Sequence, residues 1–126
     1  MEKLANKARD IRFHSEKNDC IITVHNLRAK KFALRLERDE SIKSYETNVH
    51  LKDFPAYIHL HNIRRTYQEC EWTTDFLIVK LDGTAAAREV IGYDDWGKRS
   101  VAEQMELSRR YWRALNVRDW KIVCER

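Results

Sequence analysis

The sequence has little of what disulfide-linked, zinc-bound or membrane proteins require. Its three cysteines, Cys20, Cys70 and Cys124, are widely spaced and none belongs to a CxxC pair, which argues against a disulfide framework and against a cysteine zinc site. No apolar run approaches the roughly 18 residues that a membrane span needs, and residues 1–10 lack the apolar stretch of a signal peptide. We therefore expect a cytoplasmic protein with no membrane segment.

Glycine and proline are also scarce, with three and one residues in a chain of 126. Hydrophobic residues make up 43% and charged residues 35%, so the chain has enough apolar side chains to build one core. A Gly-rich phosphate loop and a GxSxG elbow are both missing. Without a repeat or linker, we treat residues 1–126 as one domain, with 1–25 as an N-terminal extension carrying short strands and 26–126 as the core.

Two helices are predicted from apolar side chains that recur with a helical period. The first follows the N-cap candidate Asn26 and runs to about Arg38. Its buried face should hold Ala29, Phe32, Ala33 and Leu36. The second should follow a cap at Ser100, with a buried stripe made of Val101, Met105, Trp112 and Leu115.

The remaining segments have the composition of strands. Residues 74–81 include Phe76-Leu77-Ile78-Val79, which is apolar on both faces and typical of a central strand. Asp82-Gly83 predicts a tight turn to a hairpin partner at 87–91. Other extended candidates are 10–13, 20–24, 42–49, 56–64, which starts near Pro55, and 120–123. This order predicts an α/β protein with a mixed central sheet flanked by helices.

Two carboxylates stand out on the predicted hairpin. Asp75 opens the central strand and Glu89 lies on its partner, so both should lie near the strand ends away from the turn. Converging carboxylates of this kind can hold Mg²⁺ or Mn²⁺, which prefer oxygen ligands. Ordinary solvated or salt-bridged acids are the alternative.

The ordered set of motifs resembles the core of PD-(D/E)XK nucleases, and more narrowly the N-terminal domain of the TnsA endonuclease of heteromeric transposases. The resemblance spans about residues 27–125. The segments that carry it are Leu36-Glu37-Arg38-Asp39, 42–46, Thr74-Asp75-Phe76-Leu77-Ile78-Val79, Asp82-Gly83, Arg88-Glu89-Val90-Ile91, 107–112 and Trp120-Lys121-Ile122-Val123. It implies a restriction-endonuclease-like fold, with Asp75 and Glu89 as remnants of a catalytic metal site.

Three positions depart from the family's pattern. The metal-binding glutamate of the first helix aligns near Ala29, the lysine two residues after Glu89 is Ile91, and the proline before the aspartate is Thr74. Alanine cannot bind a metal and isoleucine cannot carry charge. Candidate replacements from elsewhere are Lys98, Arg99, Glu103 and Gln104.

Basic residues are clustered, although the net charge is only +4. Such clusters can neutralise phosphates, which makes duplex DNA the expected partner. The DNA-binding candidates are Lys30, Lys31, Arg35, Arg38, Lys98, Arg99, Arg109 and Arg110.

Other side chains with possible chemistry give weaker signals. His59 and His61 alternate on a predicted strand, where we interpret them as surface histidines rather than metal ligands. Trp72 and Trp96, in predicted loops, are candidates for a contact surface.

Three functions remain open. The sequence favours a nuclease-fold protein that has lost cleavage and binds DNA, a transposase subunit or another protein of a phage or mobile element. The alternatives are an active metal-dependent DNA endonuclease with relocated active-site residues, and a protein-interaction module such as a phage-encoded inhibitor.

Overall fold

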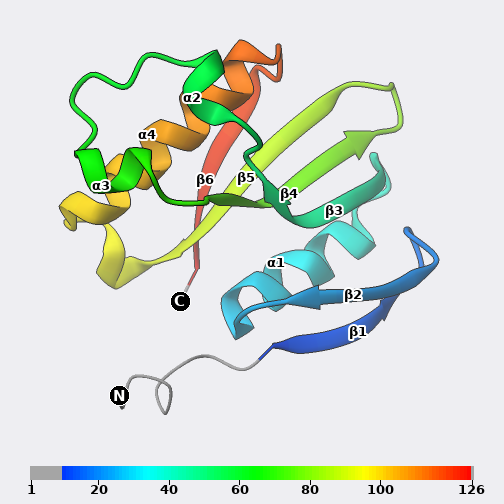
Figure 1. Cartoon of the computed structure of the whole chain (residues 1–126). Coiled ribbons are helices and arrows are strands. Elements are labelled where there is room, and N and C mark those ends of the chain that lie inside the picture. The colour runs from blue at the N-terminus through cyan, green and yellow to red at the C-terminus, as the bar shows by residue number, and fades with distance from the viewer. Residues whose placement is uncertain (1–9, 126) are drawn as a thin grey trace.

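The computed structural model describes residues 10–125 and contains a four-stranded mixed sheet with a separate hairpin (Figure 1). The strand order in the sheet is β3-β4-β5-β6, with β3, β4 and β5 antiparallel and β6 parallel to β5. These strands are β3 (Ile42–His50), β4 (Thr73–Lys80), β5 (Ala85–Gly92) and β6 (Asp119–Glu125). The predicted mixed α/β architecture is confirmed, with β4 in the interior of the sheet.

The N-terminal hairpin and the first helix form one layer. Strands β1 (Ile11–Ser15) and β2 (Cys20–Val24) pair antiparallel and pack with α1 (Leu27–Arg38) below the sheet in Figure 1. The Asn26 side chain caps α1 by accepting a hydrogen bond from the Ala29 amide at 2.8 Å. The predicted extension at 1–25 includes residues 1–9, which lie outside the described residues.

The α1 prediction is confirmed in its cap, its length and its buried face, which consists of Ala29, Phe32, Ala33 and Leu36. Together with Phe76 and Ile78 of β4, these side chains form the core on this side of the sheet. The Phe32 and Phe76 rings meet edge to face, with their centroids 5.0 Å apart. The sheet is thereby fixed against α1.

The strand predicted at 56–64 is wrong. This segment begins inside α2 (Phe54–Tyr57) and ends just before α3 (Arg65–Gln68), with irregular backbone between the two helices. Pro55 lies in the first turn of α2, where its missing amide proton costs no hydrogen bond. His59 and His61 are therefore loop residues, and their alternation on a strand does not exist.

The second long helix, α4 (Arg99–Ala114), covers the other face of the sheet together with α2 and α3 (Figure 1). Ser100 lies inside it, and the N-cap position is Lys98 with no side-chain cap. The buried residues are Glu103, Leu107, Ser108, Tyr111 and Trp112. Of the four residues predicted for the buried stripe, only Trp112 is buried. The predicted stripe is rotated about the helix axis relative to the buried face, by nearly the angle between consecutive residues. It also included Leu115, which is 40% exposed.

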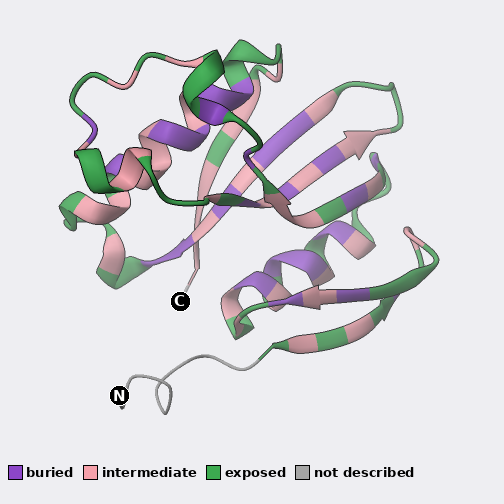
Figure 2. Cartoon of the chain, in the orientation of Figure 1, coloured by how far each residue is buried: buried purple, intermediate pink, exposed green. Residues whose placement is uncertain are grey.

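Buried side chains therefore lie on both faces of the sheet (Figure 2). The core on the α4 side includes Leu107, Tyr111 and Trp112 against Ala87 of β5. Among the helices of residues 10–125, none is long and apolar enough to cross a membrane.

Candidate functional site

The β4–β5 ladder ends at the Phe76–Arg88 partners, and the two predicted carboxylates lie immediately beyond it. There each carboxylate accepts a hydrogen bond from the opposite strand. The Val90 amide donates to Asp75 Oδ2 at 2.7 Å, and the Asp75 amide donates to Glu89 Oε1 at 3.2 Å. These side-chain hydrogen bonds thus connect the two strands beyond the end of the backbone ladder. Asp75 and Glu89 lie close together there, as the sequence predicted. We call these two residues the carboxylate site.

Glu89 is the more deeply buried of the two, with only 2% of its surface exposed. Burial, and then the neighbouring charge of Asp75, raise the pKa of Glu89 to about 8. Burial also raises the pKa of Asp75, against the opposing effects of the Val90 amide and the nearby His25. Both shifts favour a proton bound within the pair at neutral pH.

A buried hydrogen-bond network holds Glu89 in place from the α4 side. Ser108 Oγ donates to Glu89 Oε2 at 2.5 Å and accepts from Trp120 Nε1 at 2.9 Å. Thr74 Oγ1 lies 3.3 Å from Ser108 Oγ and accepts from Trp112 Nε1 at 2.6 Å. Thr74 is thus part of the support of the site. Such a network fixes a side chain because every polar member has a partner.

The carboxylate site opens into a cavity of about 350 Å³. Two further acids, Glu71 and Asp95, lie in its wall, and among the described residues that line it there is no lysine or arginine. Ile91 lines it as well, at the position where the resemblance implies lysine. Ala29, at the position where the resemblance implies a glutamate, is buried in the core formed by α1 and the sheet. The cavity is acidic and lacks both groups.

The candidate replacements supply little. Gln104 lines the cavity, whereas Lys98 binds Asp95 at 3.0 Å. Glu103 is held away by Arg64, whose Nε lies 2.6 Å from Glu103 Oε1, and by Arg99 at 3.4 Å.

The fit of the site to a metal ion can be judged from its oxygen donors. No group of three or more His, Cys, Asp or Glu side chains within residues 10–125 is arranged to hold a metal. The oxygens of Asp75 and Glu89 suit Mg²⁺ or Mn²⁺ in kind, but two side chains are too few for a tight site.

Two residues near the site were missed by sequence reasoning. His25, which follows β2, lies close enough to Asp75 to lower its pKa, and its Nδ1 is 2.8 Å from Asp10 Oδ1. Arg28, in the first turn of α1, lies against Gly92 at the end of β5 and 4.0 Å from Asp95. The signal for Arg28 was its helical spacing from later cations, whereas nothing in the sequence pointed to His25.

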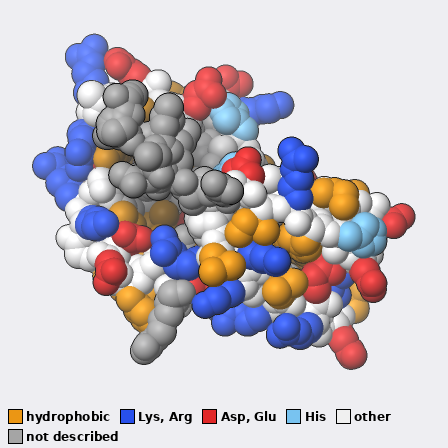
Figure 3. All heavy atoms as spheres, turned by 90° about the horizontal axis from the view of Figure 1, so that it is seen from below, with side chains coloured by type: hydrophobic (Ala, Val, Ile, Leu, Met, Phe, Trp, Pro, Cys, Tyr) orange, Lys and Arg blue, Asp and Glu red, His pale blue; other side chains and the backbone are white. Residues whose placement is uncertain are grey.

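Arg28 begins a row of cations on α1. Arg28, Lys31, Arg35 and Arg38 follow one another at intervals of three or four residues, which places them on one side of the helix. We call this row the α1 stripe. Lys30 lies on another side and is half-buried. Figure 3, which views this layer from below, shows Lys and Arg side chains in groups with hydrophobic side chains between them.

Two of the four cations of the α1 stripe have no ion pair among the described residues and are available for a ligand. Lys31 and Arg38 are exposed and form no ion pair with any residue in 10–125. Arg35 forms an ion pair with Glu125 and lies over the Phe32 ring at 5.4 Å. Of the predicted DNA-binding residues, the structure places Lys31, Arg35 and Arg38 together.

The predicted cations of α4 are mostly engaged. Arg109 and Arg110 both bind Glu106 at 2.7 Å and, with Arg109 as the larger influence, lower the Glu106 pKa to about 2. Arg110 also donates to the backbone carbonyls of His59 and His61. The Arg110 guanidinium therefore ties α4 to the loop after α2.

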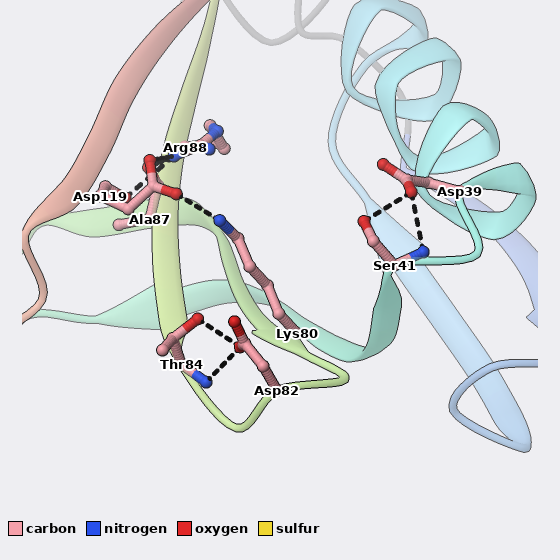
Figure 4. Close-up of polar contacts among 8 residues, drawn as sticks. All are labelled: Asp39, Ser41, Lys80, Asp82, Thr84, Ala87, Arg88 and Asp119. Atoms are coloured by element: carbon pink, nitrogen blue, oxygen red, sulfur yellow. Dashed lines mark hydrogen bonds and ion pairs between the residues drawn. The ribbon is translucent and has the colours of Figure 1, made fainter.

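A second acidic centre lies on the sheet away from the carboxylate site (Figure 4). Asp119 accepts from Lys80 at 2.6 Å and from Arg88 at 2.9 Å, and these bonds, Arg88 first, lower its pKa to about 2. Figure 4 also shows two local turns in which Asp39 accepts from Ser41 and Asp82 from Thr84. Lys80 is thus committed to Asp119 and does not serve the carboxylate site.

No protein-family model matches this chain, and a search among curated proteins found no match.

Proposed function

We propose that this chain is a nuclease-fold DNA-binding protein whose carboxylate site does not support cleavage. Duplex DNA would lie along the α1 stripe, and the resemblance to the TnsA family suggests a transposase subunit as a further partner. The proposal combines the family resemblance with one structural observation, which is the position of the stripe relative to the site.

That observation is that the α1 stripe starts at the rim of the carboxylate cavity. Arg28 lies beside Gly92 and Asp95, and Asp95 lines the cavity. From Arg28 to Arg38 the stripe extends about 15 Å at a rise of about 1.5 Å per residue. A DNA strand bound along the stripe would therefore pass the rim of the cavity. The cations of the stripe would neutralise its phosphates, and release of the counterions from these phosphates would favour binding.

The acidic cavity argues against cutting. A phosphodiester entering it would meet Asp75, Glu71 and Asp95 without a lysine or arginine in the wall. Charge that develops in a phosphoryl-transfer transition state needs positive groups near it, and losing one such group typically costs a factor of a hundred or more in rate. Here the strand lysine that the resemblance implies is missing, and so is the helix acid that would help to hold a positively charged metal ion.

DNA binding is tested by fluorescence anisotropy with a labelled duplex at several salt concentrations. The variant carries Lys31→Glu and Arg38→Glu, and Lys43→Glu, an exposed lysine on β3, is the matched control. We expect the double variant to bind at least about tenfold more weakly, with a log–log salt slope smaller by about 0.9 for each lost phosphate contact. Equal binding by the variant and the parent protein, or no duplex binding at low salt, would favour the protein-interaction alternative.

Cleavage is tested with supercoiled plasmid and Mg²⁺ or Mn²⁺, beside the Asp75→Ala and Glu89→Ala variants. We expect no nicking above background. Nicking that disappears in both variants would establish the alternative, an active endonuclease with relocated residues. Nicking that persists in both would come from a contaminant and would leave the proposal standing.

A further inference from the structure

A groove lined by three arginines lies at the end of α4 far from the carboxylate site. It measures about 340 Å³, and Arg109, Arg113 and Arg118 line it together with Val117 and Trp120. Arg113 and Arg118 are exposed and have no ion pair among residues 10–125. A cation in the last turn of a helix is favoured by the helix dipole, which accounts for Arg113. Arg109, about one turn earlier, is paired with Glu106. Neither reason applies to Arg118, which lies beyond the helix.

An apolar hollow of about 290 Å³ lies beside the groove, and Arg109 and Trp120 line both spaces. The hollow contains Trp96, which is 57% exposed, and Ile122 of β6. Trp120 is held in place by the hydrogen bond from its Nε1 to Ser108. The exposed cations Arg113 and Arg118 thus stand next to aromatic surface, whereas Arg109 is paired with Glu106, which also lines the hollow.

The hollow in turn borders the carboxylate cavity. Ile91, Val101 and Met105 line both spaces. The groove and the hollow therefore lie next to each other along α4, and we call these two spaces together the track. The helix has 16 residues, which corresponds to about 24 Å at a rise of about 1.5 Å per residue.

We propose that this track binds a single strand of nucleic acid, with its phosphates on Arg113 and Arg118 and a base against Trp96. A positive groove beside aromatic side chains is the combination by which proteins bind single strands without regard to sequence, since every base has a face that can stack. The track lies on the opposite side of the sheet from the α1 stripe, so the inference goes beyond the proposed duplex binding and does not depend on it.

The experiment measures the anisotropy of a fluorescein-labelled oligothymidine of about twelve nucleotides, a length in the range of known single-strand site sizes. The principal variant carries Arg113→Glu and Arg118→Glu, and Arg12→Glu, an exposed arginine on β1, is the matched control. We expect binding at least about tenfold weaker in the double variant, with the salt slope reduced by about 0.7 for each of the two lost contacts.

A second variant, Trp96→Ala, separates stacking from charge. We expect it to weaken binding about fivefold or more while leaving the salt slope unchanged. Thermal unfolding of each variant shows whether the fold is intact, and these exposed positions should leave it so. The Lys31→Glu, Arg38→Glu variant should retain single-strand binding, which keeps this test separate from that of the duplex.

Three results would overturn the proposal. The first is undiminished binding of the oligonucleotide by the double arginine variant. The second is no binding by the parent protein at about 50 mM salt, where electrostatic binding is strong. The third is capture by the groove of a peptide containing glutamate and tryptophan when the oligonucleotide does not bind, which would make the track a protein surface.

Discussion

Two carboxylates on neighbouring strands, Glu89 on β5 and Asp119 on β6, have opposite electrostatic surroundings. Asp119 accepts hydrogen bonds from Arg88 and Lys80, and its pKa falls to about 2. Glu89, the residue after Arg88, has an acid and a hydroxyl as neighbours, and its pKa rises to about 8. A carboxylate that is paired with cations contributes to the stability of the fold. A buried carboxylate without a cation is unfavourable for stability, and such groups are candidates for a functional role. This difference points to Glu89 and away from Asp119 as the place to look for function.

The largest effect expected from this contrast is on how the free energy of unfolding depends on pH. Glu89 binds its proton more tightly in the folded protein than in the unfolded chain, so the stability that it contributes is present at low pH and is lost as pH rises from about 4.5 to about 8. Glu89→Gln removes this titration, and its amide still accepts from Ser108. We expect the variant to exceed the parent by on the order of 3 kcal/mol near pH 9 and to match it near pH 5.

Urea unfolding of the two proteins across this pH range measures the effect. Glu46→Gln, at an exposed glutamate on β3, is the control and should leave the pH profile unchanged. A parent protein whose stability rises steadily from pH 5 to 9 would contradict the assignment of a proton to Glu89.

The opposite pH dependence of stability is expected for Asp119. Its folded pKa lies below the value of about 3.8 in the unfolded chain, so its contribution is present above about pH 4 and is lost as pH falls toward 2. Asp119→Asn leaves Lys80 and the mostly buried Arg88 without their acid. We expect a loss of about 1 to 2 kcal/mol at pH 6 that shrinks toward zero as pH approaches 2. Unfolding by urea at pH 3 and pH 6 distinguishes this from a loss that is the same at both, which would indicate packing instead.

The smallest effect concerns the coupling inside the carboxylate site. Asp75→Asn removes the neighbouring charge but keeps a side chain that can accept from the Val90 amide. We expect the Glu89 pKa to move down and yet stay above its ordinary value, because burial is the larger cause of its shift. The ¹³C shift of the Glu89 carboxyl group, followed by NMR against pH, reports this. An unchanged midpoint would show that the two acids do not interact.

The fold was largely predictable because its main elements carry local signals. Asn26 is followed by apolar residues at helical spacing, and Asp82-Gly83 joins two apolar strands, so these patterns and the tertiary structure agree. The strand predicted at 56–64 was wrong because the alternating side chains of this segment resemble those of a strand, while Pro55 lies at the start of a helical turn. Alternation alone does not distinguish a strand from an irregular segment held by contacts such as those of Arg110.

The site was only half predictable for a different reason. Asp75 and Glu89 lie on a hairpin, whose turn determines which residues face each other. Ser108 reaches Glu89 from α4, whereas His25 near Asp75 and Arg28 at the rim of the cavity belong to the layer of β1, β2 and α1 on the other face of the sheet. Their proximity follows from packing over long sequence separations, which no local spacing encodes.

The contact between Arg28 and Gly92 has a consequence for how the sequence can change over time. A β-carbon added at Gly92 would stand 3.0 Å from the guanidinium carbon of Arg28, so alanine there would push the flexible side chain aside rather than break the strand. The two positions are therefore expected to covary, with glycine at 92 accompanying a long cation at 28 and larger residues at 92 accompanying its loss. Gly92→Ala would then mimic the removal of Arg28 without changing the protein's charge.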